Sequence, residues 1–209
     1  MKNLIIIGAR GFGRELACWA ETCRGYGTEF RLKGFLDDNA AALDGYDVGL
    51  PILDAPQTYA IEKDDVFVCA LGDTKWKKYF AEMLTSRNGE FLTLVHERAM
   101  IGQRVQMGKG CVILADATLT TDIRLGDFVT VQPKVNIGHD VVLGDYAHIN
   151  ASSFLGGFAV LGEGATIHTG AQVVPGKKVG DWATVGAGSI VLRNVKPHAT
   201  VFGIPATEI

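Results

Sequence analysis

Cysteine is scarce in this sequence, and no two cysteines form a C-x-x-C pair. The four that occur are Cys18, Cys23, Cys69 and Cys111. Without such a pair, the chain gives no support for a zinc site or a thioredoxin-like redox motif. The length of the chain and the apolar neighbours of these cysteines argue against a disulfide framework. We therefore interpret them as buried thiols in a reducing compartment, the cytoplasm.

Long hydrophobic runs and a strong charge imbalance are also missing. The apolar run at residues 4–8 is followed by Arg10 and Arg14, so it is too short for a signal peptide or a membrane span. A formal net charge of −3 leaves no electrostatic footprint for nucleic acid or an anionic membrane. With 47% apolar and 21% charged residues, the composition predicts a globular cytoplasmic protein with neither of these partners.

Residues 1–95 alternate between strand-like and helix-like patterns. Apolar runs predict strands at 3–8, 30–36, 65–71 and 91–95. Apolar residues at helical spacing predict helices at 12–24 and 74–87, the second with Trp76, Tyr79, Phe80 and Met83 on one side. Asp54 is expected to cap a short helix that runs to residue 60. This alternation predicts a small α/β domain with a parallel sheet.

Glycine is abundant, with 26 residues in 209, and a repeat in residues 96–209 accounts for it. When the chain is cut into sixes from Ile101 to residue 196, every first position is aliphatic or Met. The fifth positions are small or aliphatic with one exception, Lys177, and glycine fills nine of the sixteen second positions. An ordinary β-sandwich would show a period of two. The strict period of six predicts a solenoid in which three sixes form one coil, giving just over five coils at a spacing of roughly 4.8 Å.

This pattern resembles the left-handed parallel β-helix acyltransferases of the hexapeptide-repeat superfamily. The closing segment at residues 201–206 and the segments at 7–15 and 35–38 narrow the resemblance to bacterial sugar acetyltransferases. That family includes sialic acid O-acetyltransferases and N-acetyltransferases of nucleotide-linked amino sugars. The resemblance implies an all-β left-handed helix after the α/β domain, acetyl-CoA as donor, a homotrimer, and an active site between neighbouring prisms.

Glycines follow the first predicted strand, where backbone amides at a helix N-terminus favour phosphate. Gly8, Gly11 and Gly13 have the spacing G-x-x-G-x-G, with Arg10 where the dinucleotide motif has its second glycine. A nicotinamide enzyme is therefore disfavoured, and a tight turn with no ligand is an open alternative. The resemblance implies a nucleotide-sugar site, in which Arg10 would face the diphosphate.

Two acidic residues, Asp37 and Asp38, end the second predicted strand. Carboxylates at this place in a doubly wound sheet accept hydrogen bonds from a ribose or a base, although Asp-Asp-Asn is also ordinary turn composition. We favour the ligand role because the resemblance includes this pair. Gly72 and Asp73 follow the third strand at the same sheet edge and are expected to line the pocket.

His139 is the third residue of its six and is expected to point outward near a corner. An exposed histidine is often only a surface residue, but the stretch 137–148 resembles the catalytic segment of the family, where the first histidine is the general base. One coil of 18 residues places Gly157 against His139, so its N–H could serve as an oxyanion donor. We expect His148, Gly156 and Gly157 to contact acetyl-CoA.

The same arithmetic stacks Asp122 on Asp140, and two such carboxylates repel unless a cation or a shared proton lies near them. We expect a nearby imidazolium to relieve this, and either carboxylate could orient His139. A γ-type carbonic anhydrase has the same fold but needs three histidines with a close H-x4-H pair. The spacings of 9 and 20 between His139, His148 and His168 disfavour such a metal site.

The preferred function is acetyl transfer from acetyl-CoA to the amine of a nucleotide-linked amino sugar, of the UDP-4-amino-sugar type, in bacterial surface-glycan synthesis, without a metal. Gly8, Arg10, Gly11, Gly13, Asp37, Asp38 and Gly72 would bind the nucleotide sugar, and His139, Asp140 and Gly157 would carry the chemistry. Two alternatives stay open: O-acetylation of sialic acid or another sugar, and a non-catalytic scaffold for a sugar-synthesis enzyme.

Overall fold

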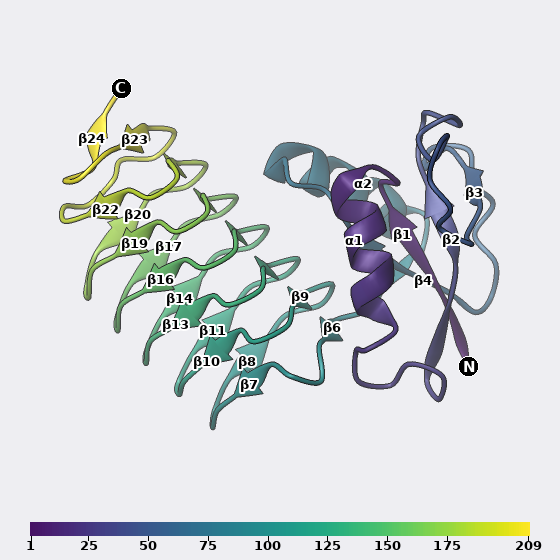
Figure 1. Ribbon diagram of the computed structural model, residues 1–209, viewed down its shortest axis with the longest axis horizontal. Helices are drawn as coiled ribbons and strands as arrows, with labels where there is room; N and C mark the ends of the chain where they lie inside the picture. The colour runs from purple at the N-terminus through teal and green to yellow at the C-terminus, as the bar shows by residue number, and fades with distance from the viewer. The chain divides into compact units, whose positions relative to one another are not determined.

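The computed structural model describes residues 1–209, which form two compact units, 1–97 and 98–209 (Figure 1). The first unit holds a five-stranded sheet with the order β3-β2-β1-β4-β5, in which every neighbouring pair is parallel. Its elements are β1 (Lys2–Ile7), α1 (Gly11–Ala20), β2 (Phe30–Leu36), β3 (Ile52–Asp54), β4 (Asp65–Cys69), α2 (Thr74–Ser86), β5 (Glu90–Phe91) and β6 (Leu94–Val95). The predicted small parallel sheet with helices is confirmed.

Two details of this unit differ from the prediction. Asp54 does not cap a helix, because its Oδ1 accepts hydrogen bonds from Ala55 N–H at 2.7 Å and from the Thr58 hydroxyl at 2.9 Å, which close a turn. Residues 52–54 form β3, an edge strand too short to stand out in the sequence. The strand predicted at 91–95 is divided into β5 and β6.

The aromatic side of α2 is not the side that packs in the interior. The buried residues of this helix are Thr74, Lys77, Ala81 and Leu84. Trp76 and Tyr79 keep 56% and 49% of their surface exposed. The helix begins at an N-cap, Asp73, whose carboxylate accepts hydrogen bonds from the N–H groups of Lys75 and Trp76. The polar residues of α2 therefore include buried ones, and its largest apolar residues reach solvent.

The second unit is a parallel β-helix of two-residue strands with three faces (Figure 1). The first face carries β7, β10, β13, β16, β19 and β22, the second β8, β11, β14, β17 and β20, and the third β9, β12, β15, β18, β21, β23 and β24. Their bounds are β7 (Met100–Ile101), β8 (Gln106–Met107), β9 (Val112–Ile113), β10 (Thr118–Leu119), β11 (Arg124–Leu125), β12 (Thr130–Val131), β13 (Asn136–Ile137), β14 (Val142–Leu143), β15 (His148–Ile149), β16 (Phe154–Leu155), β17 (Val160–Leu161), β18 (Thr166–Ile167), β19 (Gln172–Val173), β20 (Lys178–Val179), β21 (Thr184–Val185), β22 (Ile190–Val191), β23 (Thr200–Phe202) and β24 (Thr207–Glu208).

Each strand pairs with the strand one coil later, so Thr118 lies beside Asn136 and Leu119 beside Ile137, an offset of 18 residues. Five complete coils, from β7 to β21, are followed by a partial sixth with β22 and β23. This agrees with the coil number that the repeat predicts. The first-position residues point inward and form the core, where Ile113, Val131 and Ile149 are completely buried.

The corners of the helix depend on one backbone conformation. The fourth residue of every six, from Arg104 to Gly188, has a φ between 57° and 72°, the left-handed region. Ten of these residues are not glycine, among them Asp122 and Asp140. Left-handed backbone is unfavourable for such residues, so the strand pairing on either side must hold it in place. The turn in turn aims the third and fourth side chains outward at each corner.

Gly13 lies where α1 approaches the end of β1, and a Cβ at this position would overlap the carbonyl oxygen of Gly8. Gly13→Ala should therefore destabilise the fold, by about 1–3 kcal/mol or more, because backbone has to move. Gly11→Ala is the matched control, since no atom lies within 4 Å of a Cβ there and alanine favours a helix. Chemical denaturation measures both. Equal stability of the two variants would contradict the close approach.

Candidate active site

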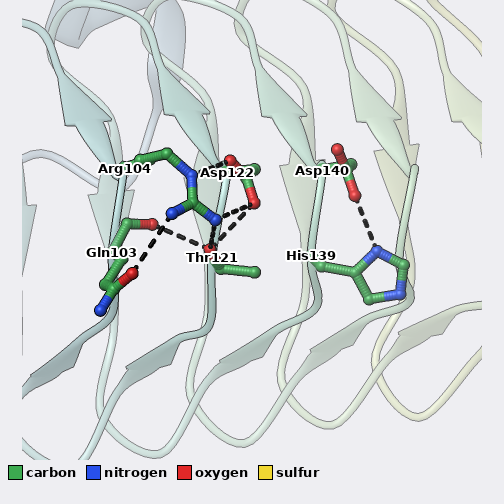
Figure 2. A network of polar contacts seen from close by, with 6 residues as sticks. All are labelled: Gln103, Arg104, Thr121, Asp122, His139 and Asp140. Atoms are coloured by element: carbon green, nitrogen blue, oxygen red, sulfur yellow. Dashed lines mark hydrogen bonds and ion pairs between the residues drawn. The ribbon is translucent and has the colours of Figure 1, made fainter.

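A histidine and an aspartate form a pair at the corner between β13 and β14. His139 Nδ1 lies 2.9 Å from Asp140 Oδ2, and both side chains are about half exposed (Figure 2). An ionised carboxylate only accepts hydrogen bonds, so the neutral imidazole paired with it carries its proton on Nδ1. Nε2 then has a free lone pair. This tautomer is the one that a general base needs.

Gly157 stacks on the imidazole of His139, as the 18-residue period predicts. A Cβ on Gly157 would lie 2.6 Å from Nε2 and 2.7 Å from Cε1 of His139. The third position holds a side chain in every other six from residue 103 to residue 187, so glycine here is the exception. The absence of a side chain leaves Nε2 open to a reactant.

The backbone N–H of Gly157 is also distinctive, because it donates no hydrogen bond within the chain although the residue is buried. At the next corner of the helix, the equivalent amides are capped. Lys109 N–H and Asp127 N–H donate to the carboxylates of Asp127 and Asp145, one coil later. At the corner of His139, no such carboxylate caps the amide of Gly157. A donor of this kind beside Nε2 has the chemistry of an oxyanion site.

Phe158 completes this corner, and the sequence analysis did not single it out. Its N–H donates to the carbonyl oxygen of His139 at 2.9 Å, and its ring meets the imidazole edge to face, with centroids 5.0 Å apart. The side chain is 58% exposed. An exposed phenylalanine beside the reactive nitrogen gives the corner one apolar wall. The stacking rule would have found it, because residue 158 lies 18 positions after Asp140.

Asp122 does not orient His139, and the cation that offsets its charge is not an imidazolium but Arg104. The guanidinium reaches both oxygens of Asp122, through Nε to Oδ1 and through NH2 to Oδ2 at 2.9 Å (Figure 2). This hydrogen bonding is the main reason why the pKa of Asp122 falls to about 2, and the Thr121 hydroxyl contributes to the same shift. Of the two carboxylates, Asp140 alone is therefore left to hold His139. Counting back one further coil from Asp122 would have identified Arg104.

The two remaining expected acetyl-CoA contacts lie elsewhere on the β-helix. His148 belongs to β15 on the third face, is 1% exposed, and has Nε2 3.4 Å from the side-chain nitrogen of Gln132. Gly156 ends β16, where a Cβ would meet the ring of Pro175 at 2.6 Å. Within one chain, His148 and His139 lie on different sides of the prism. Their roles toward acetyl-CoA stay predictions.

A second candidate site is a cavity of about 270 Å³ in the first unit, at the carboxyl ends of β1, β2 and β4. Its lining consists of Gly8, Arg10, Asp37, Asp38, Ala70, Leu71, Gly72, Asp73, Trp76 and Phe80. Five of the expected substrate-binding residues are thereby brought together. Gly11 and Gly13 do not line the cavity, and the close approach to Gly8 gives Gly13 a packing role. Trp76 and Phe80 were not expected here.

The two aspartates in this cavity have different surroundings. Asp37 is 8% exposed, and its oxygens accept hydrogen bonds from the N–H groups of Ala9 at 2.8 Å and Asn39 at 3.0 Å. It therefore ties the loop after β1 to the end of β2. Asp38 is exposed and its carboxylate faces the cavity lining without such ties. Of the pair, Asp38 is the one with its oxygens available to a ligand.

The described residues contain no group of three or more His, Cys, Asp or Glu side chains placed to hold a metal ion. None of the helices is long and apolar enough to cross a membrane.

Comparison with known proteins identifies relatives for both parts of the chain. Residues 3–84 match the model of the PglD N-terminal domain family. The chain is 31% identical over 120 residues to a UDP-N-acetylbacillosamine N-acetyltransferase of Bacillus subtilis (strain 168). This alignment covers 55% of the chain and 52% of the relative, so it spans about half of that relative's length.

Solved structures match the whole chain. The acetyltransferase domain of PglB from Neisseria gonorrhoeae FA1090 is 26% identical, with a TM-score of 0.89 and complete coverage of both chains. The same domain in complex with acetyl coenzyme A gives a TM-score of 0.87, with coverage of 100% and 99%. PerB from Caulobacter crescentus, in complex with CoA and GDP-perosamine, is 22% identical with a TM-score of 0.67 over 100% and 98% of the chains, and shows a common fold. The predicted fold class is confirmed.

Replacing Arg104 by glutamine removes the cation that holds the pKa of Asp122 near 2. In Arg104→Gln, that pKa should rise toward the ordinary value of 3.8, as a carbon-detected NMR titration of the carboxyl would measure. Because the pKa is lowered in the folded chain, the pair stabilises the fold above the ordinary pKa. This contribution is lost as the pH falls through about 2.

The control for this titration is Lys134→Gln, a change at the fourth position of a different corner, which should leave Asp122 unaffected. If the pKa of Asp122 stays near 2 without Arg104, the guanidinium is not its cause.

Proposed function

We propose that this chain, which belongs to the hexapeptide-repeat sugar acetyltransferases, transfers an acetyl group from acetyl-CoA to the amine of a nucleotide-linked amino sugar. The observation that carries the proposal is the corner where Asp140 holds Nδ1 of His139 and Gly157 leaves Nε2 open. A base and an unpaired amide donor side by side serve acyl transfer. A non-catalytic scaffold has no use for this arrangement.

In the proposed reaction, Nε2 of His139 accepts a proton from the sugar amine as its nitrogen attacks the thioester carbonyl carbon of acetyl-CoA. Negative charge then develops on the carbonyl oxygen, and the Gly157 N–H donates a hydrogen bond to it. When the C–S bond breaks, the CoA thiolate leaves and takes up a proton, while the new amide bond remains. Asp140 keeps the imidazole in the required tautomer and orientation throughout.

The nucleotide part of the substrate is assigned to the cavity of the first unit. The loop from Gly8 to Arg10 offers backbone N–H groups and a guanidinium to a diphosphate, and Asp38 offers acceptors to the ribose or the base. Asp37 shapes this cavity, because both of its oxygens hold backbone amides. We assign His148, Gly156 and Gly157 to acetyl-CoA.

Transfer to nitrogen is favoured over transfer to oxygen. The Bacillus subtilis relative carries the name of an N-acetyltransferase of a UDP-linked sugar, and the Caulobacter structure contains GDP-perosamine. We further propose that the enzyme works in the cytoplasm, where nucleotide sugars and acetyl-CoA are both found. A panel of UDP-, GDP- and dTDP-linked amino sugars, with release of free CoA thiol as the signal, tests the activity and identifies the substrate. No thiol release with any amino sugar, but release with a free sugar alcohol, would favour O-acetylation instead.

Removing the base should lower kcat by about 10²–10⁴-fold in His139→Ala, because proton transfer in the transition state contributes that much. Gly157→Ala should be similarly impaired while remaining folded, since its Cβ would push the imidazole away and not the backbone. Steady-state kinetics with the substrate found above measure both variants. His168→Ala, a change at an exposed histidine, is the control. A variant lacking His139 that keeps more than about a tenth of wild-type kcat would remove it from the mechanism.

A homotrimer is the proposed assembly, because the prism exposes apolar side chains that one chain leaves uncovered. Val142, Phe154 and Phe158 are 40%, 42% and 58% exposed. Light scattering should therefore give about 67 kDa, three times the chain mass of 22.4 kDa. A fully active monomer would show that neighbouring prisms are not needed for the site.

A further inference from the structure

Three aromatic side chains form a cluster on the solvent side of α2. The rings of Trp76 and Phe80 stack, with centroids 5.9 Å apart and an angle of 28° between their planes. Tyr79 meets Trp76 edge to face at 5.6 Å and Phe80 at 5.0 Å. Trp76 and Phe80 line the cavity described above, whereas Tyr79 does not. The cluster therefore gives the cavity one aromatic edge.

Folding of α2 does not explain why this edge is aromatic. The helix packs through Lys77, Ala81 and Leu84, and Trp76 remains 56% exposed. Tryptophan is large and amphipathic, and an exposed one at the edge of a cavity gains its burial when something binds there. The stacked Phe80 fixes the plane of the indole from one side. The other face of the indole is the one that a planar ligand would cover.

The polar groups of the cavity are placed differently. Gly8 and Arg10 come from the loop between β1 and α1, and Asp38 follows β2, whereas Trp76 and Phe80 lie on α2 after β4. A ligand that fits this lining has an anionic part for Arg10 and a flat part with hydrogen-bond donors for Trp76 and Asp38. A nucleoside diphosphate has both, since its base offers a π-face and N–H groups.

We propose that Trp76, backed by Phe80, is the surface on which the nucleobase of the substrate stacks. The inference rests on the proposed function only for the class of ligand, and it adds the residue that binds the base. Every nucleobase has a π-face, so the stack supplies affinity, while choice among bases is left to edge contacts such as Asp38.

The test is isothermal titration with UDP and GDP, without acetyl-CoA. In Trp76→Ala, the Kd for the preferred nucleotide should rise by about 5- to 150-fold, the range that one base–aromatic stack contributes. Trp76→Phe should recover most of this loss, because a phenyl ring can still stack. Quenching of tryptophan fluorescence by the nucleotide should occur in the wild-type protein and be greatly reduced in Trp76→Phe.

Tyr79→Ala is the matched control, because Tyr79 belongs to the same cluster and is nearly as exposed but does not line the cavity. Its Kd should stay within about twofold of wild type. Inorganic pyrophosphate is the second control, since a lost stack leaves its binding unchanged. Equal weakening of pyrophosphate, equal weakening by Tyr79→Ala, or no effect of Trp76→Ala would each overturn the proposal.

The outcomes for the stack and for the proposed function are distinguishable. If nucleotide binding depends on Trp76 but no amino sugar is acetylated, the stack stands and the reaction is wrong. If acetylation occurs with unchanged KM for the nucleotide sugar in Trp76→Ala, the reaction stands and the stack is wrong. Wild-type protein that binds neither UDP nor GDP would also overturn the stack.

Discussion

The register of 18 residues per coil is the constraint on which the second unit depends. Parallel pairing of two-residue strands places each residue directly beside the one a coil later, as with Thr118 and Asn136. The left-handed residue at every corner restores the chain direction after each side, so the register never slips between residues 104 and 188. Because the core residues, the corner turns and the hydrogen bonds all repeat, a side chain at a corner has its neighbours set by arithmetic. The chemistry of this protein is built on two adjacent columns of one such corner.

Along those columns, charge is arranged so that two stacked carboxylates do different work. Arg104 takes both oxygens of Asp122, which holds its pKa near 2 and offsets its negative charge. Asp140, one coil later, is free to hold Nδ1 of His139. Gly157 then follows His139 in the neighbouring column, where a missing side chain exposes Nε2 and an uncapped amide faces the same space. A change of one residue in the period would separate all of these groups.

The first unit solves a different problem, because its cavity is held by backbone contacts that do not repeat. The approach of α1 to Gly8 needs glycine at position 13, and Asp37 joins the loop after β1 to the end of β2 through two amides. These ties leave Arg10 and Asp38 at the edge of the cavity with their polar groups available. On the other side, α2 buries Lys77 and presents Trp76. The cavity is therefore polar along two loops and aromatic along one helix.

The sequence alone determined whatever follows from periodicity. The hexapeptide pattern determined the β-helix, its coil number and the meeting of His139 with Gly157, and the same counting would have reached Arg104 and Phe158. The alternation of apolar runs determined the parallel sheet, but not the short edge strand β3 or the turn at Asp54, where few residues carry the signal. Only the tertiary structure decided which of two adjacent aspartates turns inward at a strand end. It alone also decided which side of α2 is buried, because an amphipathic helix with aromatic residues on one side and alanine and leucine on another can pack through either. That choice depends on the space left by the sheet, a property of the folded chain and not of any single segment.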